Sequence, residues 1–115
     1  MSADDLERLR HMLAAAREAI SFIEGKSAED LIHNRLLLLA VVKEIEIVGE
    51  AASRISPEGR QTAPLIPWGK VTGMRNRLTH GYFNWDLEVI WSTLVTSLPV
   101  LVSELEEAIR QAANE

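Results

Sequence analysis

The sequence predicts an all-α protein, an antiparallel four-helix bundle that forms one domain over residues 1–115. Apolar residues recur at three- and four-residue steps through most of the chain, which is the period of one face of a helix. No stretch alternates apolar and polar residues as a half-buried strand would, and no internal repeat is present. A chain of 115 residues buries somewhat under ~70% of its unfolded surface, which is enough for one hydrophobic core.

The first predicted helix begins directly after Ser2 and ends at Gly25. Ser2 is a favoured capping residue, and apolar residues recur along one side of the helix as far as Ile23. Gly25 suits the left-handed backbone that often ends a helix. A second helix begins at Ser27, and we expect it to continue unbroken to about Ile55.

The second predicted helix has more apolar surface than one small core can cover. Its apolar residues, from Leu31 to Val48, face more than one side. Two interpretations fit this pattern: a central helix surrounded by its own neighbours, or a helix that offers one face to a second copy of the chain. The excess of apolar surface suggests a surface for a partner.

The second half of the chain contains two more helices. Residues 56–67 include three prolines and lack periodicity, so we expect an irregular connection. A third helix should span residues 68–79, with Gly73 allowing a close approach to a neighbouring helix. Asn84 is placed to cap the last helix, which carries the most regular apolar pattern and which Pro99 should kink.

The composition excludes several classes of protein. Without cysteine the chain can form neither a disulfide scaffold nor a thiolate metal site. No uninterrupted apolar run reaches the ~18 residues of a membrane span, and the acidic N-terminal residues are unlike a signal peptide. We therefore expect a cytoplasmic protein with no membrane partner.

The charge is unevenly distributed. The formal net charge of −5 argues against a polyanionic substrate. However, residues 51–82 contain five basic side chains and one acidic side chain. Such asymmetry can arise by chance and decorate a surface, but here it surrounds an unusual polar motif.

Three polar chemistries crowd the predicted end of the third helix. The Arg75 guanidinium can bind a phosphate through two parallel hydrogen bonds, and the His80 imidazole can transfer a proton near neutral pH. Asn76 lies four residues before His80 on the same helical face, so its amide can orient the ring. Gly81 suits a helix end, which would let His80 lean towards Arg75. Together these residues suit phosphate-ester chemistry.

The spacing of Arg75, His80 and Tyr82 resembles the R-x4-H-x-Y signature of the HepT toxins, a branch of the HEPN ribonuclease superfamily. The resemblance extends over nearly the whole chain through three flanking segments in the same order: Gly49-Glu50-Ala51-Ala52, Ile66-Pro67-Trp68 and Gly73-Met74-Arg75-Asn76. It implies a HEPN-like fold, a homodimer whose two motifs line a shared cleft, and an endoribonuclease that needs no metal ion and no cofactor.

The resemblance also implies roles for individual residues. These are catalysis for Arg75 and His80, support for Asn76 and Glu50, and RNA contact for Arg77 and Lys70. Two alternatives stay open from the sequence: Glu50 can pair with Arg54 one turn later instead of supporting the site, and Arg77 can face solvent.

The family further implies regulation by a partner protein. HepT toxins belong to type VII-like toxin–antitoxin pairs, in which an MntA-like nucleotidyltransferase antitoxin adenylylates the tyrosine at the position of Tyr82. AMP on Tyr82 would bring bulk and negative charge into a pocket for the substrate phosphate, and so exclude RNA.

A non-catalytic interpretation also fits these residues. Arg75 would be a surface ion-pair partner, His80 a residue stabilised by the helix dipole, and Tyr82 a half-buried aromatic. The chain would then be a non-catalytic HEPN interaction module that binds a nucleotidyltransferase partner.

Overall fold

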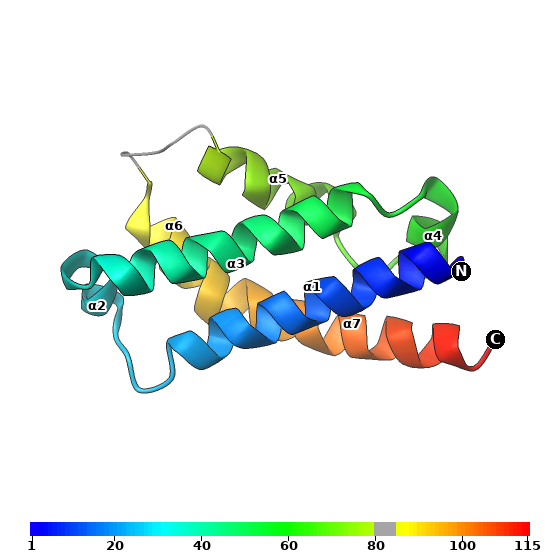
Figure 1. The fold of residues 1–115 in the computed structure, drawn as a ribbon, viewed down its shortest axis with the longest axis horizontal. Coiled ribbons are helices and arrows are strands. Elements are labelled where there is room, and N and C mark those ends of the chain that lie inside the picture. The colour runs from blue at the N-terminus through cyan, green and yellow to red at the C-terminus, as the bar shows by residue number, and fades with distance from the viewer. Residues whose placement is uncertain (80–84) are drawn as a thin grey trace.

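The computed structural model describes residues 1–79 and 85–115, and the regular structure of these residues is entirely helical (Figure 1), which confirms the all-α prediction. In chain order the elements are α1 (Ala3–Phe22), α2 (Ala28–His33), α3 (Arg35–Ser53), α4 (Pro57–Thr62), α5 (Trp68–Thr79), α6 (Leu87–Ser92), the π-helical turn η1 (Thr93–Ser97) and α7 (Leu98–Ala113).

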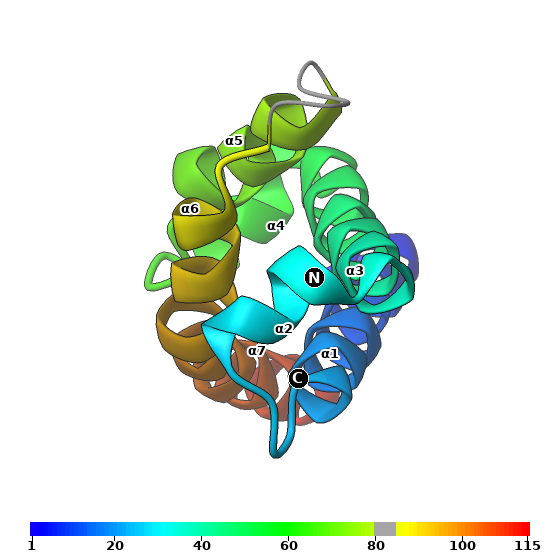
Figure 2. The same ribbon diagram turned by 90° about the vertical axis from the view of Figure 1, so that its left-hand side faces the viewer.

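Helix α3 occupies the middle of the arrangement. It packs against α1 on one side and α5 on the other, while α1 also packs against α7 (Figures 1 and 2). Each long element contributes fully buried apolar side chains to one core, among them Leu9, Val41, Val71, Leu94 and Leu105. This packing holds α3 and α5 side by side, and the residues of the predicted site lie on these two helices.

The predicted second helix is two helices, so the expectation of an unbroken helix was wrong. Asn34 adopts an extended backbone between α2 and α3. Its side-chain oxygen accepts a hydrogen bond from the Leu37 amide at 3.0 Å, which caps α3. Asparagine competes for backbone hydrogen bonds in this way, and it therefore favours a helix start over a helix interior.

The connection before α5 also contains more order than expected. Ser56 caps the short helix α4 by accepting a hydrogen bond from the Gly59 amide at 3.0 Å. Pro57 occupies the first turn of α4, where a missing amide proton costs no hydrogen bond. The third predicted helix, in contrast, is confirmed with the expected bounds as α5.

The start of the last helical run is capped by Asp86, whose side chain accepts hydrogen bonds from the amides of Glu88 and Val89. The predicted cap, Asn84, lies outside the described residues. The π-helical turn η1 ends at Ser97, two residues before Pro99, and the kink expected at Pro99 stays a prediction. A widened turn accommodates the missing amide and the bulk of the proline ring.

Two acidic side chains are buried at the contact between α1 and the elements around α3. Asp5 is 2% exposed and accepts hydrogen bonds from the Ser56 amide, at 3.0 Å, and from the Ser56 hydroxyl. Burial tends to raise the pKa of Asp5, but these hydrogen bonds outweigh it and lower the pKa below the usual value.

Glu44, on α3, is 7% exposed. Its pKa is raised to about 7, first by burial and then by the hydrogen bond and negative charge of Glu18 on α1. Glu44 therefore keeps its proton at pH values at which an exposed glutamate has lost it.

The last helical run also has the length and composition of a possible membrane span. Residues 87–113 form 27 helical residues of apolar character. Leu94, Leu98 and Leu105 of this run are buried in the core, 22% of its apolar window is buried in all, and the run is the one such helix among the described residues. The finding is therefore weak evidence for a membrane.

Candidate functional site

Arg75 lies on α5 at the closest approach of α5 to α3. Trp68, Val71 and Leu78 form the buried side of α5, and Met74 is partly buried beside them. Where α5 meets α3, a Cβ atom added to Gly49 would lie 2.5 Å from the Cβ of Arg75, far inside normal contact distance. Gly49 therefore allows the backbone of α5 to sit directly on α3 at the position of Arg75.

This finding corrects the expected role of Gly73. A Cβ atom added to Gly73 would have no atom within 4 Å among the described residues. The glycine that permits the close contact between α3 and α5 is thus Gly49 of α3.

Glu50 connects two arginines from different helices. Its Oε2 atom accepts a hydrogen bond from Arg75 Nη1 across the helix contact. Its Oε1 atom pairs with Arg54, one turn later on α3, at 3.1 Å from Nε and 3.0 Å from Nη2. The two arrangements that the sequence left open for Glu50 therefore occur together.

The two guanidinium groups keep Glu50 ionised. Partial burial tends to raise the pKa of Glu50, but the hydrogen bond and charge of Arg75, and then those of Arg54, lower it below the usual value. The Glu50 carboxylate holds the side chain of Arg75 at the surface of α3 in a defined position.

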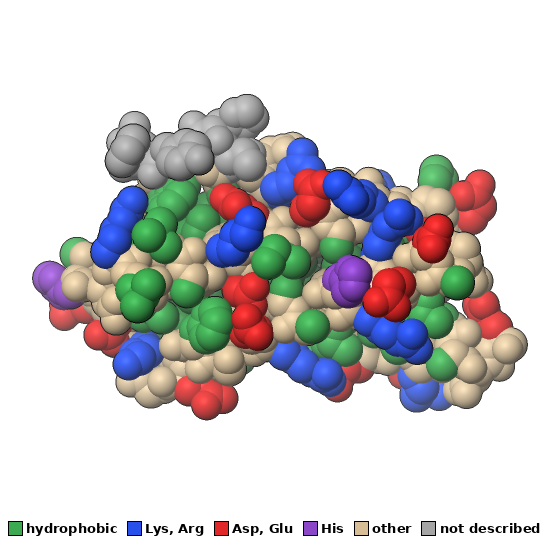
Figure 3. Space-filling view, in the orientation of Figure 1, with side chains coloured by type: hydrophobic (Ala, Val, Ile, Leu, Met, Phe, Trp, Pro, Cys, Tyr) green, Lys and Arg blue, Asp and Glu red, His purple; other side chains and the backbone are tan. Residues whose placement is uncertain are grey.

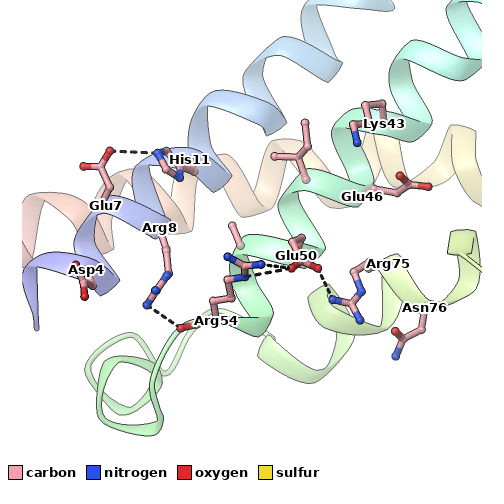
Figure 4. A pocket seen from close by; sticks show the side chains of 12 residues that line it. Asp4, Glu7, Arg8, His11, Lys43, Glu46, Glu50, Arg54, Arg75 and Asn76 are labelled. Atoms are coloured by element: carbon pink, nitrogen blue, oxygen red, sulfur yellow. Dashed lines mark hydrogen bonds and ion pairs between the residues drawn. The ribbon is translucent and has the colours of Figure 1, made fainter.

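Arg75 and Asn76 open into a cleft of about 890 Å³ between α1, α3 and α5. Figure 4 shows Glu50 in the middle of this cleft, with Arg54 and Arg75 on either side of it and Arg8 reaching from α1. The lining residues are Asp4, Glu7, Arg8, His11, Lys43, Glu46, Ile47, Glu50, Ala51, Arg54, Arg75 and Asn76. The cleft thus combines guanidinium groups with space for a ligand larger than one phosphate.

His80 and Tyr82 lie outside the described residues. Helix α5 ends at Thr79, directly before His80 in the sequence. The meeting of Arg75, His80 and Tyr82 in one pocket is therefore still a prediction.

Lys70 and Arg77 lie on another side of α5 from Arg75. They line a groove of about 320 Å³ together with residues of α6 and η1, including Asp86 and Thr93. Side chains two residues apart in an α-helix point about 200° apart around its axis, so those of Arg75 and Arg77 point in different directions. The structure brings Glu50, Arg75 and Asn76 together and separates them from Lys70 and Arg77.

The wall that α1 contributes to the cleft was not predicted from the sequence. His11 pairs with Glu7, one turn earlier on α1, at 3.1 Å. Arg8 donates from Nη1 to the carbonyl oxygen of Arg54 at 3.1 Å. The contact between Arg8 and Arg54 joins residues 46 positions apart in sequence, so helix periodicity could not indicate it.

Within residues 1–79 and 85–115, no three histidine, aspartate or glutamate side chains gather as a metal site would require. The groups that the described part of the cleft offers are guanidinium, ammonium, carboxylate, amide and imidazole. Such groups can bind a phosphate, stabilise negative charge and position a neighbouring side chain.

Comparison with known proteins points to one family. Residues 12–108 match the family model described as "Ribonuclease HepT-like". A candidate RNase of Caldanaerobacter subterraneus is 32% identical over 103 residues, which cover 90% of this chain and 92% of that protein. A candidate RNase of Methanocaldococcus jannaschii is 32% identical over 92% of this chain and 98% of its own length.

A third relative, from Thermococcus cleftensis, is named "Probable ribonuclease HepT". It is 34% identical over 94 residues, which cover 78% of this chain and 86% of that protein. No solved structure shows a significant match to the chain.

Proposed function

Because the chain belongs to the ribonuclease HepT-like family, we propose that it is a metal-independent endoribonuclease toxin whose catalytic residues are Arg75 and His80. The observation that carries the proposal is the position of Arg75, which Glu50 holds where it lines a cleft of about 890 Å³. The relatives named as RNases support the same substrate class.

The proposed reaction uses the 2′-hydroxyl of RNA as the nucleophile. A base removes its proton, the 2′-oxygen forms a bond to the adjacent phosphorus, and the bond from phosphorus to the 5′-oxygen breaks as that oxygen takes up a proton. His80 supplies one of these proton transfers, typically worth about 10²- to 10⁴-fold in rate. Arg75 stabilises the charge on the phosphoryl oxygens, and Asn76 orients the imidazole ring.

Glu50 acts in this scheme as a positioning residue. A guanidinium group has five N–H donors, so Arg75 can keep its bond to Glu50 and still bind a phosphate. A side chain fixed in advance loses less conformational freedom when it binds the transition state. Arg54 holds the other oxygen of Glu50 and so stabilises the same arrangement.

Lys70 and Arg77 are proposed to contact the RNA backbone away from the reacting phosphate. The groove lined by Lys70 and Arg77 and the cleft lined by Arg75 lie on different sides of α5. An RNA strand that contacts both the groove and the cleft must therefore pass over α5. Their contacts would raise affinity without contributing to the chemical step.

We also propose that the chain forms a homodimer with the HEPN-like, antiparallel four-helix arrangement. Ile32 and Leu36 are 62% and 80% exposed, and Leu39 is 43% exposed. Figure 3 shows hydrophobic side chains gathered over the end of this face where α2 meets α3. A second copy that covers this surface would remove large apolar side chains from water.

The dimer is tested by analytical ultracentrifugation of the wild type and of Leu36→Asp. We expect a dimer for the wild type and a monomer for the variant, because a carboxylate at the centre of an apolar interface loses its hydration. A wild-type monomer at micromolar concentration contradicts the proposal.

Regulation is proposed to act through Tyr82. An MntA-like nucleotidyltransferase antitoxin would transfer AMP from ATP to the tyrosine oxygen with release of pyrophosphate, in the cytoplasm where both partners meet RNA. Intact-mass measurement after incubation with ATP and the cognate transferase should show one added AMP on the wild type and none on Tyr82→Phe. Equal labelling of both proteins contradicts this role of Tyr82.

The nuclease is tested with single-stranded RNA in the presence of EDTA. The wild type should cut, while Arg75→Ala and His80→Ala should lose cutting and keep the helical circular-dichroism signal. Arg10→Ala is the matched control, since Arg10 is an exposed α1 residue that does not line the cleft. Full cutting by the Arg75 and His80 variants would remove the proposal.

The alternative is a non-catalytic interaction module. The exposed apolar surface of α2 and α3 favours it as much as it favours a dimer. Stable binding of a nucleotidyltransferase, with no RNA products from any substrate, would identify the chain as such a module.

A further inference from the structure

The wall of the cleft formed by α1 has no part in the proposed reaction. The space extends from Arg75 on α5, past the end of α3, to Arg8 and His11 on α1 (Figure 4). At about 890 Å³ it falls in the range of sites that enclose a whole small ligand, and it is larger than one reacting phosphate needs.

Three arginines stand in a row along this space. Arg8 donates to the carbonyl oxygen of Arg54 at 3.1 Å, the Arg54 side chain pairs with Glu50 at 3.0 Å, and Glu50 also binds Arg75. The three guanidinium groups come from three helices, yet they are connected through one backbone carbonyl and one carboxylate. Their relative positions are therefore set by the fold.

Arg8 and Arg54 have donors left for a ligand. A guanidinium carries five N–H donors, of which Arg8 uses one in its hydrogen bond and Arg54 uses two in its contacts with Glu50. The Arg8 side chain is 35% exposed and that of Arg54 is 64% exposed, so both reach solvent in the cleft. Planar guanidinium forks match the oxygens of a phosphate.

The acids in the cleft restrict what can bind there. Asp4, Glu7, Glu46 and Glu50 line it beside the basic residues, and Glu7 already pairs with His11. A cleft of mixed charge does not attract polyanions in general. It favours a ligand whose phosphates meet the guanidinium groups at defined positions.

We propose that Arg8 and Arg54 form a subsite for a backbone phosphate of single-stranded RNA, next to the phosphate that reacts at Arg75. The strand would then run from α5 across the end of α3 to α1. The subsite rests on the proposed function, because it takes RNA as the ligand of the cleft. The exposed apolar residues Leu36 and Leu39 lie at the opposite end of α3 from Arg54.

The test measures binding separately from cutting. A fluorescent 2′-O-methyl RNA oligomer lacks the nucleophile and cannot be cut, so its anisotropy gives the affinity at several salt concentrations. Each phosphate contact adds about 0.7 to the slope of log affinity against log salt for single strands. We expect Arg8→Gln to lower the slope by about 0.7, and Arg8→Lys to keep most of the slope while weakening the affinity.

Arg10→Gln is the matched control on the same helix. It removes the same charge from an exposed position that does not line the cleft, so its slope should equal that of the wild type. Equal slopes for Arg8→Gln, Arg10→Gln and the wild type would overturn the subsite. An equal decrease in both variants would also overturn it, because it would mean that only the overall charge matters.

Cutting of unmodified RNA separates the subsite from the nuclease. If the wild type cuts RNA, Arg8→Gln should raise KM for an oligomer of about eight nucleotides and leave kcat unchanged. Cutting that depends on Arg75 but not on Arg8 would overturn the subsite alone. Binding that depends on Arg8 without any cutting would overturn the nuclease alone, and the absence of RNA binding by the wild type would overturn the subsite.

Discussion

Gly49 determines how closely α5 can approach α3, so its replacement by alanine tests the geometry of the site. The added Cβ atom would lie 2.5 Å from Arg75 Cβ and 3.2 Å from Arg75 N. Carbon atoms in good contact are about 3.5–4.0 Å apart, so α5 must move by roughly 1 Å. Such overpacking costs about 1–3 kcal/mol, against a gain of up to about 1 kcal/mol from the higher helix propensity of alanine.

Gly73→Ala is the control for this substitution. An added Cβ atom meets no described atom within 4 Å there, so only the helix-propensity gain of up to about 1 kcal/mol remains. The free energy of unfolding of Gly49→Ala should therefore fall below that of Gly73→Ala by about 1–3 kcal/mol. Urea denaturation followed by circular dichroism measures both values at one fixed protein concentration.

The same pair of variants tests the link between packing and activity. A displacement of about 1 Å at a catalytic group can cost on the order of 10² in rate. We expect a loss of that size in kcat/KM for RNA with Gly49→Ala and wild-type activity with Gly73→Ala. If Gly49→Ala is as stable and as active as Gly73→Ala, the close contact does not position Arg75 and the reasoning is refuted.

Three further substitutions test the buried and bridging carboxyl groups. The pKa of Glu44 is raised from 4.5 to about 7 in the folded state. Between these pH values the folded protein keeps a proton that the unfolded chain releases, so the free energy of unfolding falls as the pH rises. Glu44→Gln should be more stable than the wild type by up to about 3 kcal/mol at pH 8 and equally stable near pH 4, as measured by denaturation at each pH. Equal stability of the two proteins at pH 8 would show that the pKa of Glu44 is not raised by folding. Asp5 has a lowered pKa in the folded state, so its stabilising effect should be present above the ordinary aspartate pKa and disappear as the pH falls through the folded value. Asp5→Asn should cost about 1–3 kcal/mol at pH 7 because the hydrogen bonds of Ser56 lose a charged acceptor, and an unchanged thermal midpoint would contradict this. Glu50→Gln leaves Arg75 without its ionised partner and should lower kcat/KM for RNA by up to about 10²-fold; an unchanged rate in the cleavage assay would show that Arg75 needs no such support.

Local sequence patterns predict most of the helices. The structure differs from the prediction where the signal of a single capping residue competes with the periodicity of a longer segment. The apolar run of residues 36–48 suggested that one helix continues through Asn34, but the capping hydrogen bond to Leu37 divides it. The short helix α4 has a capping serine and a first-turn proline, yet six residues show no periodicity. In both cases a capping residue was present in the sequence, but the prediction relied on apolar periodicity, which only longer segments show.

The site was predictable only as far as single helices allow. Arg75, Asn76 and Glu50 came from the motif and its flanking segment, and the structure brings them together. The choice between Gly49 and Gly73 depends on which side of each helix faces the other, which a single helix does not reveal. Arg8 enters the cleft through a contact between α1 and the end of α3, and no spacing within either helix encodes that contact.

The central claim is that Arg75 stabilises the reacting phosphate of RNA. Its most direct test is the single-turnover rate of cutting at saturating RNA in EDTA, compared between the wild type, Arg75→Ala and Arg10→Ala. The account predicts a loss of about 10²- to 10³-fold for Arg75→Ala, the usual effect of removing one preorganised donor, and no loss for Arg10→Ala. Equal single-turnover rates for all three proteins would contradict it.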